Sequence, residues 1–172
     1  MPAPARLRVA LVSEVFFGPD ASTRLAEHLQ RARAGGAQLV LLPELPLQPW
    51  APATRQVHDD DAEPRGGPRQ RMLADAARQV GIAVVGGAIV VEGDHRENQA
   101  FVVDATGAER GRYSKLHLPQ EPWFWEADHY RPGDGALPLM ALHGVPFGLQ
   151  ICSDINRPQG AHILAARGAR LL

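Results

Sequence analysis

The fold class is decided by residues 7–42, which read LRVALVSEVFFGPDASTRLAEHLQRARAGGAQLVLL. The first six residues, LRVALV, form a short apolar run that is typical of a buried strand. A helix is predicted next, because apolar residues recur at the i, i+4, i+7 spacing of one face: Leu25, Leu29 and Ala32. Gly35-Gly36 supplies its end, since a helix end often needs a residue with positive φ. A second apolar run, QLVLL at 38–42, completes a β-α-β unit and indicates an α/β architecture.

The rest of the chain continues this alternation after a long irregular stretch rich in Pro and Asp, residues 43–67. A helix is predicted from Pro68 to Gly81, with one apolar face formed by Met72, Ala76 and Val80. We expect Gly86-Gly87 to break or bend the strand that follows. The remaining predicted elements are strands at 82–91, 99–104 and 109–113, a hairpin of 137–142 with 145–151, a helix at 158–166 and the start of a strand at 170–172.

Size and composition favour one globular domain over residues 1–172. The chain is 45% hydrophobic and 22% charged, which is typical of soluble proteins. Its net charge of -1, with no basic stripe, argues against a nucleic-acid partner. The start, MPAPARLR, lacks the apolar stretch of a secretory signal, and no apolar run is long enough to span a bilayer. We therefore expect a cytoplasmic protein without a membrane partner.

The metal-binding residue types are sparse or scattered. The only cysteine, Cys152, cannot form an internal disulfide and excludes a multi-cysteine zinc site. The 7 histidines show no metal-ligand spacing. We expect neither a metal nor a cofactor.

Three polar residues directly follow apolar strands: Glu44, Lys115 and Cys152. Ligands of α/β sheets bind beyond the carboxyl ends of strands, so these three side chains could converge there. Taken singly, each has an ordinary interpretation. A lone cysteine is most often a small buried hydrophobe, and a loop Glu or Lys is usually a solvated charge.

Four segments of the sequence indicate the function more strongly as motifs than their residues do one by one. They are LLPELPL (41–47), ENQAFVVDATG (97–107), YSKLHLP (113–119) and GLQICSDINRP (148–158). In order and spacing the first, third and fourth resemble the three signature blocks of the nitrilase, or carbon–nitrogen hydrolase, superfamily, and the second resembles the strand and turn that precede the lysine block. The resemblance implies part of a four-layer α-β-β-α sandwich that assembles as a homo-oligomer.

The resemblance also implies a role for each of the three residues. Cys152 would be the nucleophile that attacks an amide carbonyl and forms a thioester. Glu44 would be the general base, and Lys115 would meet the oxyanion together with the backbone N–H of Ser153. We expect the Lys115 ammonium and a helix N-terminus at 156–158 to favour the thiolate form of Cys152.

A second glutamate often completes the site in this superfamily, and the chain offers Glu121 and Glu126. Glu126 is the better match, because it precedes the unit YRPGD at a fixed step; a solvated loop carboxylate is the alternative. The stretch 115–134 most resembles the N-carbamoyl amine and N-carbamoyl amino acid amidohydrolases, which implies a small amide or N-carbamoyl substrate. In that pattern His117 either lines the pocket or is a structural histidine. Arg157 either binds a substrate carboxylate or anchors a helix start.

The chain departs from the family pattern in two ways. Ser153 and Gln159 stand where many relatives carry an aromatic residue and a glutamate, which leaves the substrate preference open. The chain also stops soon after the helix that follows Cys152, so we expect the C-terminal part of the fold to be lacking. The alternative to a cysteine-dependent amidase is therefore a catalytically inactive, truncated module with a binding or regulatory role.

Overall fold

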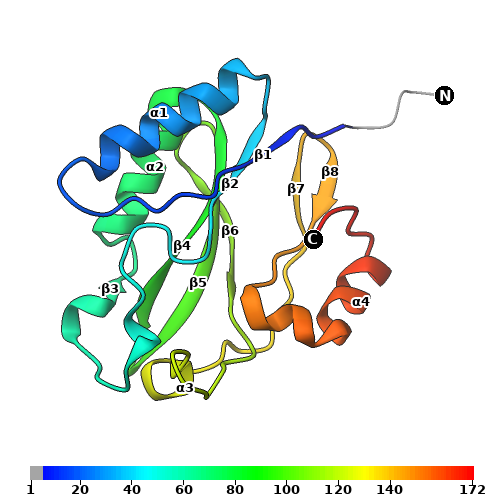
Figure 1. Ribbon diagram of the computed structural model, residues 1–172. Coiled ribbons are helices and arrows are strands. Elements are labelled where there is room, and N and C mark those ends of the chain that lie inside the picture. The colour runs from blue at the N-terminus through cyan, green and yellow to red at the C-terminus, as the bar shows by residue number, and fades with distance from the viewer. Residues whose placement is uncertain (1–5) are drawn as a thin grey trace.

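The computed structural model describes residues 6–172, so part of the N-terminal stretch in which no secretory signal is expected lies outside it. A mixed six-stranded sheet forms its centre (Figure 1). The elements of the first half are β1 (Val9–Leu11), α1 (Ala21–Ala34), β2 (Leu39–Leu41), the 3₁₀ helices η1 (Ala51–Ala53) and η2 (Asp59–Asp61), β3 (Glu63–Pro64), α2 (Pro68–Val80) and β4 (Ala83–Glu92). Those of the second half are β5 (His95–Val103), β6 (Glu109–Ser114), α3 (Glu126–His129), β7 (Met140–Leu142), β8 (Val145–Phe147), the 3₁₀ helix η3 (Cys152–Asn156) and α4 (Pro158–Ala166).

The sheet combines a parallel half with an antiparallel half in the order β1-β2-β4-β5-β6. β1, β2 and β4 pair in parallel, as the predicted β-α-β unit requires, and β3 pairs in parallel with the end of β4. β4, β5 and β6 then form an antiparallel meander. The α/β architecture predicted from residues 7–42 is confirmed.

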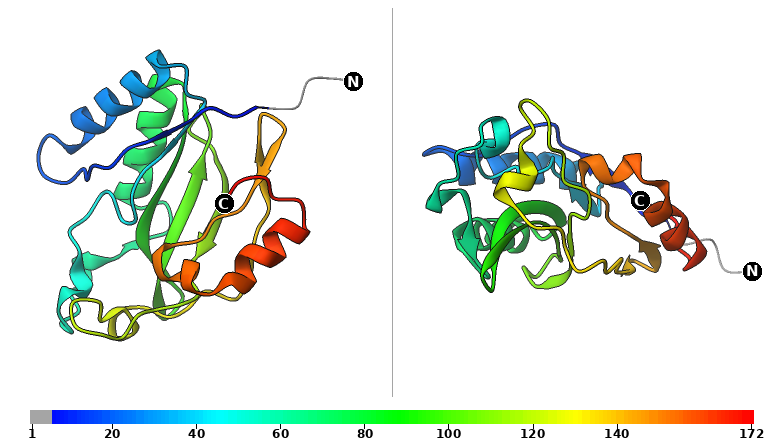
Figure 2. Two further views of the ribbon diagram at one scale, coloured as in Figure 1. Left: turned by 45° about the vertical axis from the view of Figure 1, so that its right-hand side comes forward. Right: turned by 90° about the horizontal axis from the view of Figure 1, so that it is seen from below.

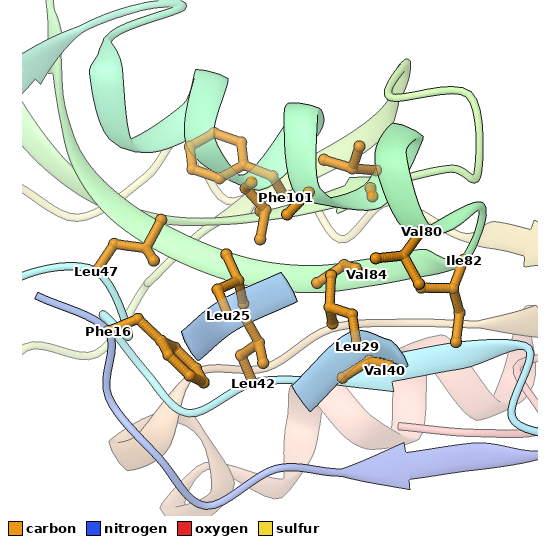
Figure 3. Close-up of a cluster of buried hydrophobic side chains, with 14 of the residues drawn as sticks. Phe16, Leu25, Leu29, Val40, Leu42, Leu47, Val80, Ile82, Val84 and Phe101 are labelled. Atoms are coloured by element: carbon orange, nitrogen blue, oxygen red, sulfur yellow. The ribbon is translucent and has the colours of Figure 1, made fainter. Parts of the chain in front are cut away.

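One face of the sheet packs against α1 and α2 (Figure 3). α1 contributes Leu25 and Leu29, both fully buried, as its spacing predicts. In α2 the predicted residues Ala76 and Val80 are buried, whereas Met72 is only partly buried and Leu73 takes its place in the core. Burying each large aliphatic side chain contributes about 1.5–3 kcal/mol relative to leaving it exposed, so this core stabilises the sheet strongly.

The other face of the sheet packs against the chain that follows β6. A second apolar cluster joins Val85 and Val102 of the large sheet to Phe147, Leu149 and Ile151. In Figures 1 and 2, α4 lies beyond this segment, on the opposite side of the sheet from α1 and α2. The layers thus run from α1 and α2 through the large sheet and the small β7-β8 sheet to α4, in the order that the α-β-β-α prediction implies.

Gly86 and Gly87 do not break β4, so the predicted interruption is wrong. The strand pairs with β5 without a shift of register from Val84 to Glu92. The two glycines allow neighbouring groups to approach the strand closely. A Cβ on Gly86 would lie 3.1 Å from a methyl carbon of Leu73, and one on Gly87 would lie 2.9 Å from the carbonyl oxygen of Gln99.

The other differences concern where elements begin and end. β5 begins at His95, four residues before the predicted start. The hairpin arms are confined to β7 and β8, and the predicted last strand is a single bridge between Leu171 and Phe147. No helix within residues 6–172 is long and apolar enough to cross a membrane.

Candidate active site

Glu44 lies just beyond β2, in a tight turn at the end of the parallel half of the sheet. The turn is fixed by the next residue, Leu45, which is buried and has a φ of 49°. Glu44 Oε1 accepts a hydrogen bond of 2.8 Å from Nδ2 of Asn98, a buried residue of β5. The carboxylate is thereby held against the face of the sheet opposite α1 and α2.

Lys115 directly follows β6, and its side chain is fully buried. Its Nζ donates to Glu44 Oε1 at 2.8 Å and to Glu126 Oε1 and Oε2 at 2.7 and 2.8 Å. Glu126, the first residue of α3, is also fully buried. The structure therefore brings together Glu44, Lys115 and Glu126, whereas Glu121 is exposed and forms a backbone bridge with Phe124.

Burial and ion pairing act in opposite directions on this cluster. Burial alone would lower the pKa of Lys115, but its hydrogen bonds with Glu126 and Glu44 outweigh burial and raise that pKa. Burial raises the pKa of Glu126, and the contact with Lys115 opposes this rise. Lys115 consequently stays charged at neutral pH. A buried ammonium with two carboxylates around it is costly to disrupt.

Cys152 is the first residue of η3 and has a φ of 46°, a left-handed conformation that is uncommon for a residue with a side chain. It is exposed to solvent. Together with Glu44 and Asn98 it lines a cavity of about 170 Å³ between the large sheet and residues 149–152. The cysteine and the carboxylate therefore share one cavity.

The environment of Cys152 sets the pKa of its thiol. Burial raises the pKa of the Cys152 thiol, and the charge of Glu44 raises it further, while Lys115 lowers it. The net shift of the pKa is upward, so burial and the charge of Glu44 outweigh the effect of Lys115, which acts in the expected direction. The helix N-terminus at 156–158 belongs to α4, and Cys152 begins its own 3₁₀ turn. The uncharged thiol is a weaker nucleophile than the thiolate.

Asp154 ties the turn of Cys152 to the segment of Lys115. Its Oδ1 accepts hydrogen bonds from the backbone N–H groups of Leu116 and His117, at 3.2 and 2.9 Å. The same oxygen lies 2.8 Å from Nδ1 of His117. Oδ2 accepts hydrogen bonds from Tyr113 Oη and from the backbone N–H of Ile151, at 2.7 and 3.1 Å. Asp154 is thus a structural hydrogen bonder that connects the two segments.

A wider, open cavity of about 620 Å³ lies on the outer side of Cys152. His117, Ser153 and Arg157 line it, so all three predicted binding residues share this cavity with Cys152. His117 combines the two alternatives, because it lines the cavity while Asp154 holds its ring. The Ser153 hydroxyl donates to the carbonyl oxygen of His117. Arg157 is exposed and immediately precedes α4.

Sequence reasoning missed Asn98 and Tyr113, which contact Glu44 and Asp154. Both lie in the sequence motifs described above, at 97–107 and 113–119. A polar residue in a strand could nevertheless lie on either face of the sheet, so its partner could not be predicted. The spacing offers a signal in retrospect, because Asn98 alternates with Ala100 and Val102 on one face of β5. Within residues 6–172 no cluster of three or more His, Cys, Asp or Glu residues is suited to hold a metal ion.

The chain matches known proteins over most of its length. A sequence family described as carbon-nitrogen hydrolase matches residues 21–172. A nitrilase from Pyrococcus abyssi is 34% identical over 156 residues, covering 90% of this chain and 58% of that protein. An N-carbamoylputrescine amidase from Arabidopsis thaliana is 28% identical over 179 residues, covering 100% of this chain and 60% of that protein. The chain therefore spans less than two thirds of the length of either relative.

Solved structures agree with the fold. A double mutant of the amidase from Nesterenkonia sp. AN1, in complex with acrylamide, gives a TM-score of 0.82 at 26% identity and covers 99% of this chain and 65% of that chain. Another structure of the same amidase shows the result of Michael addition of acrylamide at its active-site cysteine. That structure gives a TM-score of 0.78 at 25% identity and covers 96% of this chain and 65% of that chain.

Proposed function

The chain belongs to the carbon-nitrogen hydrolase family, and we propose that it cleaves a non-peptide carbon–nitrogen bond of a small amide or N-carbamoyl compound through a thioester on Cys152. One observation carries this proposal. The buried ammonium of Lys115 joins Glu44 to Glu126, and Glu44 shares a cavity with Cys152. A nucleophile, a base and a cation thus converge from segments far apart in the sequence.

Acylation begins with the transfer of the thiol proton from Cys152 to Glu44. The raised pKa of Cys152 makes this transfer necessary, because little thiolate is present without a base. The thiolate then attacks the carbonyl carbon of the substrate, and the carbonyl oxygen takes the negative charge. Glu44 returns its proton to the leaving nitrogen, so that ammonia or an amine departs and the thioester remains.

Lys115 stabilises the oxyanion of the tetrahedral intermediate, together with the backbone N–H of Ser153. Within residues 6–172, the hydrogen bonds of Lys115 Nζ in the resting site all go to carboxylate oxygens of Glu44 or Glu126. When Glu44 takes up the thiol proton it becomes neutral, and its attraction for Lys115 weakens. The ammonium is then free to contact the oxyanion while Glu126 holds it in place.

Deacylation reverses these proton movements with water as the nucleophile. Glu44, deprotonated again, removes a proton from water, and the hydroxide attacks the thioester carbon. The carbon–sulfur bond breaks, the acid product leaves, and Cys152 regains its proton. The steps balance without a metal or cofactor, and we propose that neither is required.

The substrate class rests on the resemblance of residues 115–134 to N-carbamoyl amidohydrolases and on the N-carbamoylputrescine amidases among the relatives. His117 and Arg157 border the open cavity beside Cys152, where the part of the substrate away from the carbonyl would lie. We also propose a cytoplasmic homo-oligomer without nucleic-acid or membrane partners. Light scattering of the purified protein tests the oligomeric state.

The direct test is release of ammonia from a panel of N-carbamoyl amines, N-carbamoyl amino acids and aliphatic amides, with Cys152→Ala as the control. We expect hydrolysis of at least one class and a loss of at least about 10³-fold in the variant. Equal inactivity of folded wild type and variant would overturn the proposed function and favour a binding or regulatory module. Activity that survives Cys152→Ala would overturn the cysteine mechanism alone.

A further inference from the structure

We propose that Asn98 is a positioning residue for the base, which fixes the Glu44 carboxylate so that its Oε2 serves Cys152; this rests on the proposed function. Asn98 is 1% exposed, and its Nδ2 donates to Glu44 Oε1 at 2.8 Å. It also lines the cavity that Glu44 and Cys152 share.

The hydrogen bonds that Glu44 accepts from Asn98 and Lys115 end on the same oxygen. Oε1 receives Nδ2 of Asn98 and Nζ of Lys115, both at 2.8 Å. A carboxylate oxygen has two lone pairs, so these donors occupy Oε1 and leave Oε2 for the thiol. Lys115 alone would not fix the carboxylate plane, because a single donor permits rotation about the last side-chain bond. The second donor removes that freedom.

Asn98 also places the lysine through its backbone. The backbone N–H of Lys115 donates to the carbonyl oxygen of Asn98 at 2.9 Å, which continues the pairing of Gln99 with Ser114. One residue of β5 therefore sets the position of the lysine with its carbonyl group and the position of the glutamate with its amide group. A side-chain substitution at this residue leaves the backbone contact in place, so the two roles can be separated.

The test uses Asn98→Leu, which removes the donor at similar size, and Asn98→Asp, which replaces the amide with a carboxyl group. Gln48 provides control variants, because it is a buried amide whose Nε2 donates to the carbonyl oxygen of Asp61 while its Oε1 accepts from the backbone N–H of Ile89. Gln48→Leu and Gln48→Glu repeat the same chemical changes away from the cavity. Thermal unfolding of all four variants identifies any that fail to fold.

With a substrate from the hydrolysis panel, Asn98→Leu should lower kcat by about 10- to 100-fold with little change in KM, because the base is misplaced while binding is kept. Asn98→Asp should be most active at low pH, where a proton shared by the introduced carboxyl group and Glu44 restores a donor, and should lose activity as the pH rises. A merely structural role would not produce this pH dependence. The Gln48 variants should keep the wild-type profile.

A readout without substrate separates the two proposals. Cys152 is the only cysteine, so its alkylation by iodoacetamide can be followed over pH in each variant. Asn98→Leu should move the alkylation midpoint toward that of Glu44→Gln, because the carboxylate is no longer held beside the thiol. If Glu44→Gln moves the midpoint and Asn98→Leu does not, the role of Asn98 is refuted. If the wild type hydrolyses nothing while alkylation responds as expected, the proposed function fails and the positioning by Asn98 stands.

Discussion

The hydroxyl group of Tyr113 donates a buried hydrogen bond of 2.7 Å to Oδ2 of Asp154. Tyr113 precedes Lys115 by two residues, and Asp154 follows Cys152 by two residues. This bond therefore couples the strand that presents the ammonium to the turn that presents the thiol.

Replacing Tyr113 with Phe should lower the free energy of unfolding by about 1–2 kcal/mol, because Asp154 Oδ2 loses a buried donor. Urea unfolding measures the loss. Tyr130→Phe is a matched control, since the Tyr130 hydroxyl is buried without a hydrogen-bond partner in the part of the chain that the structure describes. Tyr130→Phe should lower the free energy of unfolding much less than Tyr113→Phe does. Equal losses in the two variants would mean that the Tyr113 hydroxyl contributes nothing specific.

Replacing Lys115 with Met should destabilise the protein by about 3–5 kcal/mol, because two carboxylates remain without their buried cation. The loss should shrink at low pH, where Glu126, whose pKa burial already raises, takes up a proton. Adding Glu126→Gln to Lys115→Met should recover part of the stability. Arg78→Met removes a cation whose partner, Asp75, is exposed, and should cost less than about 1 kcal/mol. A Lys115→Met variant as stable as Arg78→Met would contradict the buried cluster.

Replacing Glu44 with Gln should have opposite effects on hydrolysis and on alkylation. If Glu44 is the base, as proposed, its removal should lower hydrolysis by about 10²-fold or more. Removing its charge should lower the pKa of Cys152, so that iodoacetamide reacts at lower pH than in the wild type. Asp75→Asn, on the exposed side of α2, serves as the control for loss of a carboxylate. An alkylation midpoint that rises, or stays where it is, would contradict the electrostatic role of Glu44.

Replacing Gly87 with Ala should destabilise the protein by about 1–3 kcal/mol, because the new methyl group meets the backbone carbonyl of Gln99 at 2.9 Å. Gly86→Ala should cost less, since its nearest neighbour is the flexible end of the Leu73 side chain. Thermal unfolding of the two variants ranks them. If Gly86→Ala is the more destabilising of the two, contact with α2 rather than the pairing of β4 with β5 is what excludes a side chain from this part of the strand.

The fold could be predicted from the sequence where apolar residues are regularly spaced, as in residues 7–42. The spacing predicted α1 because Leu25 and Leu29 repeat at helical intervals. It misplaced the start of β5, because polar residues such as His95 and Glu97 lie in a strand that pairs along its whole length with β4. It also took Gly86-Gly87 for a break, since a glycine required by a close neighbour resembles a glycine required by a bend.

Only part of the candidate site could be predicted from the sequence. Residues such as Glu44 and Lys115 could be predicted from the sequence motifs in which they lie. The direction in which the pKa of Cys152 shifts could not be predicted from the sequence, because it depends on how near Glu44 lies in three dimensions. Asn98 was missed for the same reason, since its partner is 54 residues away.

The meander of β4, β5 and β6 has a consequence for the time course of folding. Its strands pair with neighbours along the chain, whereas Lys115 must reach Glu44 across 71 residues and Tyr113 must reach Asp154 across 41. Contacts between distant residues carry the larger entropy of loop closure, and they form late. We therefore expect a refolding chain to pair the strands of the meander before the Lys115 ammonium meets its carboxylates. Recovery of secondary structure should then precede assembly of the Glu44–Lys115–Glu126 cluster.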